Sequence, residues 1–389
     1  MSVLKDPLAF PLTEIRAMFP GASEAVYLNS AAESLFMESH RGALSSYADQ
    51  KSRGAAGRAA CADVESRCRS LVAELLGVHA GDIAFLASTA RGLDVVIKSI
   101  EWREGDNIVL ADSEFPTAAF AAARLASMGV EHRVVRARGG ELLLDDFAEQ
   151  IDARTRLVCV SAVSYKNGFK IDIPSFAAVA HAAGALLFVD AVQAMGVVPL
   201  DARLADFLCA GTYKWLLGSH GLAVFYVNPR LVDELVAPYV GYRGVVDIFP
   251  SDRFDRFELF PDARRFEEGM PNYPGLFVLE NALSFLLSVG VERISEHVAG
   301  VVMAVMKGLD DMGVQPLTTR DSAARGAIVS FETRHAERVV TELEREGIRV
   351  WGRDGRVRIS PHLYNGEDDV VALFDRLRVL VAERGLRLQ

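Results

Sequence analysis

The sequence predicts an α/β protein with a mostly parallel central sheet covered by helices on both faces, plus a smaller α+β domain at its C-terminal end. Three observations predict this. Short apolar runs alternate with longer helical patterns through the middle of the chain. The pattern changes after about residue 250, and 389 residues exceed one ordinary core. We expect a large domain over residues 20–255 and a small domain over residues 256–389, which also includes residues 1–19.

The large domain is expected to contain seven strands. The apolar runs that predict them lie at residues 82–88, 107–112, 132–137, 156–163, 185–192, 205–211 and 222–228. Helical stretches lie between most of these runs, for example at 116–128 and 174–183. The second of these helices ends at Gly184, a residue suited to the turn after a helix. A short glycine-containing link joins the last two runs, which allows one antiparallel pairing at an edge.

The small domain begins after a charged, loop-like stretch, SDRFDRFELFPDARR. Helical patterns, separated by short strand-like runs, are expected in the remainder. The helices are predicted at 274–289, 291–312, 337–347 and 368–384, and the strands at 326–333, 348–352 and 356–360.

Composition and charge narrow the classes of partner. The formal net charge of −10 argues against nucleic acid and against an anionic membrane surface. No basic N-terminal region precedes an apolar one, and no window approaches 18 uninterrupted apolar residues. We therefore expect a cytoplasmic protein that binds neither nucleic acid nor membrane.

The four cysteines predict neither a disulfide framework nor a metal site. Cys61 and Cys68 lie two helical turns apart without a C-x-x-C motif or a histidine cluster. Cys159 and Cys209 lie inside apolar runs and are expected to be reduced core thiols.

Polar residues follow several of the predicted strands, and ligands of open parallel sheets bind beyond the carboxyl ends of the strands. Lys214 lies in the otherwise apolar stretch CAGTYKWLLGSHG. A buried lysine must have a partner, lose its proton or be used covalently. Asp190 ends another strand, where a carboxylate is costly unless it meets a cation. A turn of small residues at 88–90 opens a helix and offers N–H groups to an anion.

Each of these features also has a simpler explanation. Residues 88–90 are compatible with an ordinary helix cap, Asp190 with a loop cap and Lys214 with a salt bridge. One ligand would satisfy all of them together. Pyridoxal 5′-phosphate carries a phosphate, a basic ring nitrogen and an aldehyde, and Phe115 could stack on its ring.

Longer motifs resemble the class V aminotransferase and cysteine desulfurase group of fold-type I pyridoxal-phosphate enzymes. The segments FVDAVQAMG and AGTYKWLLGSHGLAVFYV carry the resemblance. It extends to YLNSAAES, STARGLD, EGMPNYPGLFVLENAL and RVRISPHLYNGEDDV, in the right order along nearly the whole chain. The resemblance implies a fold-type I architecture and pyridoxal 5′-phosphate as cofactor.

The resemblance also implies roles at the cofactor. Lys214 would form the Schiff base and shuttle the proton at Cα, and Asp190 would pair with the pyridinium nitrogen. Gln193 would contact the ring near O3′, and Phe115 would cover the ring. The phosphate would be bound by Ser88, Thr89, Ala90 and Tyr213.

Further roles concern the substrate and a second subunit. Arg358 would clamp the substrate carboxylate in a bidentate fork. Asn29 and Ala31 would line the mouth of the substrate site. Gly269 and Met270 would reach the partner's phosphate group, because family members are homodimers with shared active sites.

Several positions depart from the family pattern. Phe115 stands where many members have a histidine, Tyr213 where a phosphate-binding histidine is usual, and Met270 in place of a threonine. The stretch GIRVWGRDGRVRIS contains no cysteine to accept sulfur. We therefore do not expect a persulfide-forming cysteine desulfurase. The features E-F-P, T-Y-K-W-L and S-x-x-S-Y-x-N-G resemble the isopenicillin N epimerase-like branch of the family.

The predicted function is the conversion of an amino acid through an external aldimine and a quinonoid after Cα–H cleavage. Transamination, elimination, racemisation and substitution all stay open, and a C–S lyase or an epimerase is the alternative within the family. A nucleotide-binding oxidoreductase would need a G-x-G-x-x-G motif, which the stretch LASTARGLD does not supply. A non-catalytic pyridoxal-phosphate binder is the remaining alternative.

Overall fold

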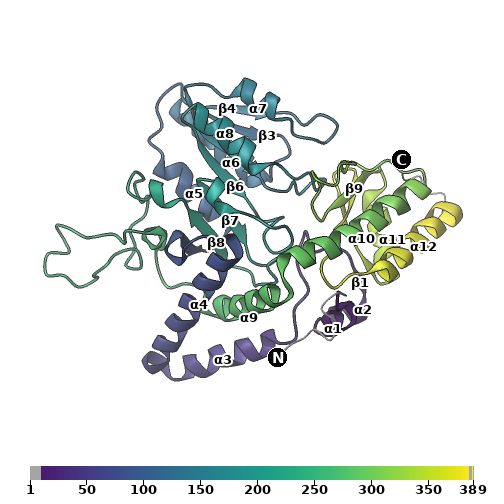
Figure 1. The fold of residues 1–389 in the computed structure, drawn as a ribbon, viewed down its shortest axis with the longest axis horizontal. Coiled ribbons are helices and arrows are strands. Elements are labelled where there is room, and N and C mark those ends of the chain that lie inside the picture. Colours follow the sequence, from purple (N-terminus) through teal and green to yellow (C-terminus); the bar gives the residue numbers. More distant parts are fainter. Residues whose placement is uncertain (1–9, 385–387, 389) are drawn as a thin grey trace.

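The computed structural model describes residues 10–384 and 388. Its elements, in chain order, alternate between helix and strand through the middle of the chain (Figure 1). The helices are α1 Leu12–Ala17, α2 Gly21–Glu24, α3 His40–Ser52, α4 Arg58–Leu76, α5 Thr89–Ser99, α6 Pro116–Leu125, α7 Leu144–Gln150, α8 Ile173–Ala182, α9 Tyr273–Val289, α10 Val291–Asp311, α11 Ala336–Arg345 and α12 Glu367–Arg384. The strands are β1 Val26–Tyr27, β2 Ile83–Leu86, β3 Asn107–Ala111, β4 Glu131–Val135, β5 Thr155–Ser161, β6 Leu186–Asp190, β7 Phe207–Gly211, β8 Ala223–Val227, β9 Val329–Glu332, β10 Ile348–Arg349, β11 Trp351–Arg353 and β12 Arg356–Ile359.

A seven-stranded sheet forms the centre of the molecule, with the strand order β2-β8-β7-β6-β5-β3-β4. The pairs from β7 to β4 are parallel, whereas β8 is antiparallel to both of its neighbours. This confirms the mostly parallel α/β sheet that the sequence predicts. The antiparallel strand β8 lies inside the sheet and not at its edge, because β2 pairs with its outer side.

Alternate residues of the central strands enter two different cores. In β5, Val158 and Val160 pack in one buried cluster, while Leu157 and Cys159 pack in the other. Side chains of a strand point alternately to the two faces of its sheet, so the two clusters are the two faces. α5 and α6 supply the second cluster, and α8 and α9 supply the first. Helices therefore cover both faces, which buries the strands and leaves their carboxyl ends for a ligand.

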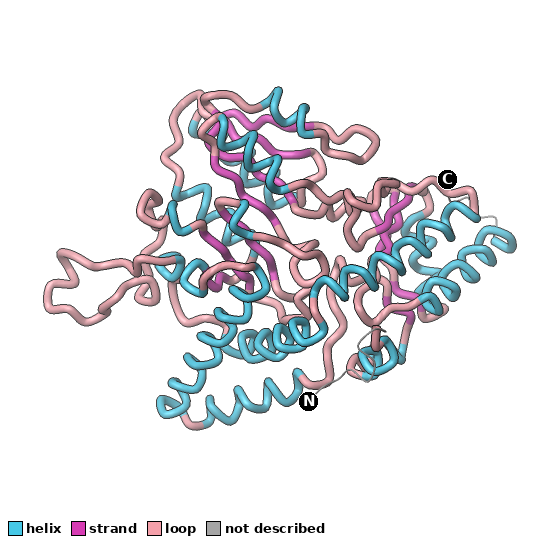
Figure 2. The backbone as a smooth tube through the Cα atoms, viewed as in Figure 1, coloured by secondary structure: helices cyan, strands magenta, loops and turns pink. Residues whose placement is uncertain are grey.

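A three-stranded antiparallel sheet, in the order β11-β12-β9, lies apart from the central sheet beside α10, α11 and α12 (Figures 1 and 2). The N-terminal segment reaches this region. β1 pairs with β10, and the Arg16 guanidinium bonds the Asp368 carboxylate of α12 at 2.6 Å. These contacts agree with placing the N-terminal segment in the small domain. The division near residue 255 stays a prediction, and its parts at 1–9, 385–387 and 389 lie outside the described residues.

The predicted elements differ from the structure at residues 348–352 and in the helices before the central sheet. The run at 348–352 forms two strands, since Ile348–Arg349 pairs with β1 and Trp351–Arg353 with β12. The helices α3 and α4 were not predicted. Residues 232–262 contain no long helix and no strand, in agreement with the loop-like stretch expected there, and include the projecting loop on the left of Figures 1 and 2. At 348–352 the chain changes its strand-pairing partner from β1 to β12 within a few residues, and the period of apolar residues in the sequence does not reveal such a change.

None of the described helices is long and apolar enough to cross a membrane by itself. Among them, α9 and α10 together have the length and composition of a membrane span, but the pair is bent by 78°.

Candidate active site

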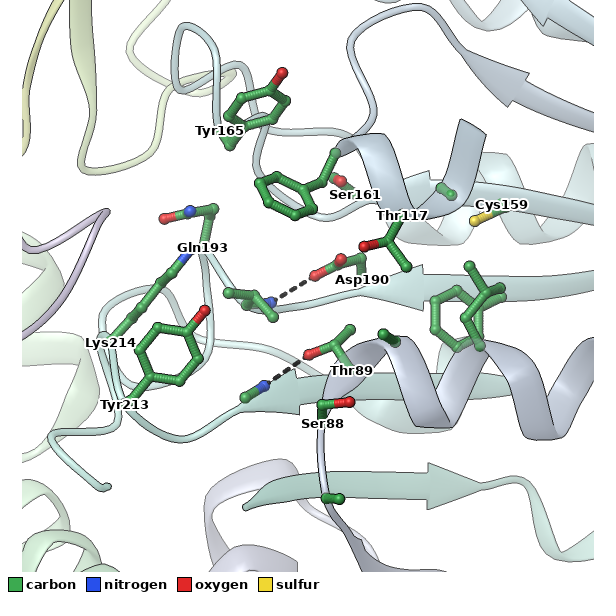
Figure 3. A pocket seen from close by; sticks show the side chains of 18 of the residues that line it. Ser88, Thr89, Thr117, Cys159, Ser161, Tyr165, Asp190, Gln193, Tyr213 and Lys214 are labelled. Carbon is green, nitrogen blue, oxygen red and sulfur yellow. Dashed lines mark hydrogen bonds between the residues drawn. The ribbon is translucent and has the colours of Figure 1, made fainter. Parts of the chain in front are cut away.

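A cavity of about 190 Å³ lies at the carboxyl ends of β6 and β7 and at the start of α5 (Figure 3). Its walls bring together side chains from five separate segments of the chain. The residues of the predicted site that line it are Ser88, Thr89, Ala90, Phe115, Asp190, Gln193, Tyr213 and Lys214. Strand order explains this convergence, because neighbouring parallel strands end at one edge of the sheet.

Lys214 follows β7 and extends into the cavity (Figure 3). Its side chain is buried with 7% of the residue exposed. The pKa of the amine is lowered to about 8, chiefly by burial and also by the charge of Arg358, while the charge of Asp190 acts in the opposite direction. The turn that holds it contains Leu217, whose φ of 57° lies in the left-handed region that non-glycine residues rarely adopt. The site thus maintains an amine that loses its proton more easily than an ordinary lysine.

Asp190 ends β6 and faces the cavity (Figure 3). The backbone N–H of Val192 donates to Oδ1 at 2.9 Å, and no cation lies within salt-bridge distance of the carboxylate among the described residues. Removal from bulk water raises the pKa of Asp190, while the Val192 hydrogen bond and the charge of Lys214 lower it. A carboxylate in this position favours a positively charged ligand group directly in front of it.

The opposite end of the cavity is formed by the N-terminus of α5. Ser88 caps the helix by accepting a hydrogen bond from the N–H of Arg91 at 3.1 Å. The Thr89 hydroxyl accepts one from the N–H of Gly211 at 2.9 Å, which ties the helix to the end of β7. The ring of Tyr213 lies at the same cavity, and burial raises the pKa of its hydroxyl, so the group stays a hydrogen-bond donor. The positive end of a helix together with hydroxyl donors suits a phosphate.

Two more side chains define the space between these ends. Phe115 lies with its ring centroid 5.3 Å from that of Tyr165 and 5.9 Å from the Lys214 Nζ. The Gln193 amide donates to the Ala31 carbonyl at 3.0 Å and accepts from the Trp215 indole N–H at 2.8 Å. One amide hydrogen of Gln193 is therefore left for a ligand. These two hydrogen bonds fix the orientation of the Gln193 side chain, which suits a residue that positions a ring.

The other predicted site residues lie outside the lining of this cavity. Arg358 is 4% exposed on β12, and its Nη1 donates to the Tyr165 carbonyl at 3.0 Å. Asn29 carries an unpartnered Oδ1 and forms a bridge with Ser360. Ala31 is buried and takes part through its carbonyl.

Gly269 and Met270 line a second cavity next to the first. The two cavities share Ala87, Gly221 and Leu222. Met270 is 52% exposed, so its side chain is available to another subunit.

Sequence reasoning gave no role to Glu114, which the structure places beside the site. Glu114 is buried, and its carboxylate accepts hydrogen bonds from the N–H and the hydroxyl of Ser161 at 2.9 and 2.6 Å. Burial raises the pKa of Glu114 to about 8, against the effect of the Ser161 bonds and with a contribution from Asp190. The only signal in the sequence was its position directly after a predicted strand.

The residues of the cavity fit pyridoxal 5′-phosphate. A carboxylate without a cationic partner lies at one end, a helix N-terminus at the other, and an amine with a lowered pKa beside them. These are the groups that the ring nitrogen, the phosphate and the aldehyde require. Asp190, Lys214 and residues 88–90 would hold the cofactor.

Comparison with known proteins identifies relatives along the whole chain. The model of the aminotransferase class-V family matches residues 26–373. An uncharacterised aminotransferase, YcbU of Bacillus subtilis, is 26% identical over 366 residues, which cover 94% of this chain and 96% of that protein. A probable cysteine desulfurase of Pyrococcus abyssi is 26% identical over 334 residues, 80% of this chain and 82% of that protein.

Solved structures share the fold. The apo cysteine desulfurase of Thermococcus onnurineus superposes with a TM-score of 0.89 at 24% identity, over 99% of this chain and 100% of that one. A mutant of the protein C-DES, with glycine covalently linked to its pyridoxal-phosphate cofactor, superposes with a TM-score of 0.85 at 23% identity, over 93% and 98% of the chains. These structures confirm the fold-type I architecture.

One prediction is corrected by these findings. The exclusion of a persulfide-forming cysteine desulfurase is wrong, because relatives and structural neighbours alike are named cysteine desulfurases. The exclusion rested on one stretch without a cysteine. Segments far apart in the sequence meet at this site, as Asn29 and Ser360 do, so a single stretch is too narrow a criterion.

The family match and the residues of the cavity agree on the cofactor, which is pyridoxal 5′-phosphate. This chain belongs to the aminotransferase class-V family of pyridoxal-phosphate enzymes.

Proposed function

We propose that the protein is an enzyme that removes a proton from Cα of an amino-acid substrate with Lys214 as the base. The observation that carries the proposal is the position of Lys214 and Asp190 on one cavity, close enough that the charge of each affects the pKa of the other. Bound pyridoxal 5′-phosphate supplies an aldehyde that condenses with amines and a ring that accepts electrons released at Cα.

Three residues of this chain have separate proposed roles around the cofactor. Lys214 would take the Cα proton on Nζ and return it later, which suits an amine whose pKa is lowered to about 8. Asp190 would keep a proton on the ring nitrogen, since no other cation of residues 10–384 forms a salt bridge with its carboxylate. Arg358 would bind the substrate carboxylate with its buried guanidinium.

Cleavage of a C–S bond is the second candidate, and the names of relatives favour it. One relative is named a probable cysteine desulfurase, and one solved structure is a complex of the cystine C–S lyase C-DES with its reaction product, cysteine persulfide. Both names refer to sulfur amino acids. Cysteine and cystine therefore belong in the first panel of substrates beside the common amino acids. We further propose that the protein acts as a homodimer in the cytoplasm.

Absorption spectroscopy tests the proposal. The protein with its cofactor should be yellow, and borohydride reduction followed by mass spectrometry should locate the cofactor on Lys214. Addition of a substrate should change the absorption spectrum, and product analysis separates the reactions. A 2-oxo acid without loss of the side chain indicates transamination, inverted Cα indicates epimerisation, and pyruvate or alanine with released sulfur indicates C–S cleavage. A yellow protein whose spectrum ignores every amino acid would show that it only binds the cofactor.

A further inference from the structure

Two arginines lie next to each other on β12, on the face of the small sheet that is turned away from its core. Val357 and Ile359 enter the buried core, so Arg356 and Arg358 share the opposite face. Residues two apart on a strand are about 6.6 Å apart. Both arginines are buried, with 7% and 4% of the residue exposed.

Neither guanidinium is neutralised by a close carboxylate. Nε and Nη2 of Arg356 and Nε of Arg358 are buried and have no hydrogen-bond partner. The only acid within 4 Å of Arg356 among the described residues is Asp354, whose Oδ2 lies 3.8 Å from Nη2 and whose side chain is 72% exposed. Glu332 is opposite Arg356 in the strand register and forms no salt bridge with it. Two adjacent buried cations without an anion are costly, which favours an anionic ligand.

Aromatic rings hold the two side chains in place. The Arg356 guanidinium carbon lies 5.4 Å from the ring centroid of Tyr165 and 5.1 Å from that of Trp351. The Arg358 guanidinium carbon lies 4.9 Å from the Trp351 centroid. Stacking on a ring leaves the N–H groups at the edge of the guanidinium free to bind in its plane.

These arginines are continuous with the active site. Tyr165 lines the cavity of Lys214, accepts a hydrogen bond from Arg358 through its carbonyl, and carries Arg356 against its ring. The charge of Arg358 lowers the pKa of Lys214, and the charge of Arg356 lowers the pKa of Arg358. Three cationic groups therefore follow one another outward from the cavity.

We propose that Arg356 binds a second acid group of the substrate. The substrate is then an α-amino acid whose side chain ends in an anion, such as a carboxylate or a sulfinate. Arg358 binds the carboxylate on Cα and Arg356 binds the acid at the other end. A substrate with a neutral side chain leaves Arg356 buried without an anion, so the site discriminates against it. This inference rests on the proposed function, because it places the substrate beside Lys214.

Substrate titrations of the protein with its cofactor test the inference. Aspartate, glutamate and cysteine sulfinate are compared with asparagine, glutamine and alanine through the change in the absorption spectrum. We expect the acidic amino acids to be bound about 10- to 100-fold more tightly than their neutral counterparts. R356M should bring that ratio close to one, and R356K, which keeps the charge but loses the planar fork, should retain part of it. Equal affinities in the wild-type protein, or an unchanged ratio in R356M, would overturn the inference.

A second measurement needs neither a variant nor turnover. Calorimetry of the wild-type protein should detect binding of succinate and glutarate, and at least tenfold weaker binding of butyrate, which has one carboxylate. Equal binding of the mono- and dicarboxylates contradicts a second anion site. The two proposals fail differently. If no amino acid changes the spectrum, the proposed function fails; if neutral amino acids act as well as acidic ones, only the role of Arg356 fails.

Discussion

Lys214 is the residue on which the proposed chemistry depends, and the environment of its amine leads to a measurable prediction. Its pKa is lowered from 10.5 to about 8, chiefly by burial, so the folded protein binds a proton less readily than the unfolded chain. Between pH 8 and 10.5 the unfolded state holds more protons, and the stability of the apo protein should rise with pH. Below pH 8 the penalty for burying the charge is fully present. We expect this contribution to reach about 3 kcal/mol.

Comparison with K214M isolates that contribution from other titrating groups. Urea unfolding of both apo proteins at pH 7, 8, 9 and 10 gives the difference in their free energies of unfolding. Wild type should gain on the variant as pH rises. The control is K307M, which removes an exposed lysine paired with Asp311 and should show no comparable trend. A difference between wild type and K214M that is constant with pH would contradict the lowered pKa.

Asp190 makes a second prediction at the scale of one residue. D190N keeps the shape of the side chain but removes the charge that, in the proposed function, would pair with the ring nitrogen of the cofactor. We expect kcat/KM to fall by about 10²–10³, which corresponds to about 3–4 kcal/mol of transition-state stabilisation. D233N is the matched control, because the Asp233 carboxylate is 91% exposed and Asp233 is not among the residues that line the cavity. Loss of activity without loss of the melting temperature supports the role, and near-normal activity of D190N contradicts it.

Individual site residues were predictable only where the sequence joined an unusual residue to a strand end. Lys214 and Asp190 stood out because charged groups ended apolar runs. The pairing of Arg358 with an equally buried Arg356 was less visible, because exposed strands also alternate charged and apolar residues. Glu114 gave almost no signal, since its burial depends on Ser161 of another strand. The burial of a side chain by segments far away in the sequence could not be predicted from the sequence.

At the scale of elements, the β11–β12 hairpin positions Arg356 and Arg358. Its two-residue turn consists of Asp354 and Gly355, with φ of 54° and 71°, which is the pattern of a type I′ turn. G355A should lower the free energy of unfolding by about 1–2 kcal/mol, because a residue with a Cβ is strained in this conformation. A Cβ at this position would meet no atom within 4 Å, so the backbone conformation alone accounts for the cost.

A glycine in a helix provides the opposite expectation. Gly300 lies in the interior of α10, and a Cβ there also meets no atom within 4 Å. G300A should therefore raise the free energy of unfolding by about 0.5–1 kcal/mol. Chemical denaturation of both variants measures the two values. Equal effects of the two substitutions would contradict the assigned turn.

Helices and strands were predicted correctly where buried residues recur along the sequence in one simple pattern. Apolar runs identified all seven strands of the central sheet, and six of these strands are largely buried on both faces; the edge strand β4 is mostly exposed. α3 was missed because only His40 of that helix is buried, so it has no apolar stripe. α4 did carry a helical signal, because Cys61, Val64, Cys68 and Val72 recur at three- and four-residue spacing. In the sequence analysis the two cysteines were considered only as candidates for a disulfide or a metal site, and the helical period of these four residues was not used to predict a helix.

At the scale of the whole molecule, the site is assembled from both ends of the chain. Asn29 bridges Ser360 beside the small sheet, and the Ala31 carbonyl holds Gln193 of the central sheet. The order of motifs along the sequence indicated this assembly, but their spacing could not. The contact between residues 29 and 360 joins segments from opposite ends of the chain, which no local pattern encodes.

The homodimer is the prediction that belongs to this scale. The loop of residues 236–261 projects from the molecule and carries exposed aromatic side chains, among them Phe249 at 80% and Phe254 at 86% exposure (Figure 1). Apolar side chains gathered on one exposed segment favour coverage by another surface. Gly269 and Met270 line the cavity next to the proposed cofactor cavity and are proposed to reach the partner. We expect light scattering to give twice 42.4 kDa for the wild-type protein at micromolar concentration.

Replacing both aromatic rings of the loop tests which surface makes the dimer. The double variant F249S/F254S should weaken the dimer and shift the mass toward 42.4 kDa on dilution, while the chain stays folded because these side chains make few internal contacts. F120S is the matched control, since Phe120 is 73% exposed on α6 and its loss changes surface hydrophobicity away from the loop. Because the active sites are expected to be shared, the monomer should also hold the cofactor less tightly. A wild-type monomer would contradict the dimer, and a double variant with unchanged mass would exclude the loop as its interface.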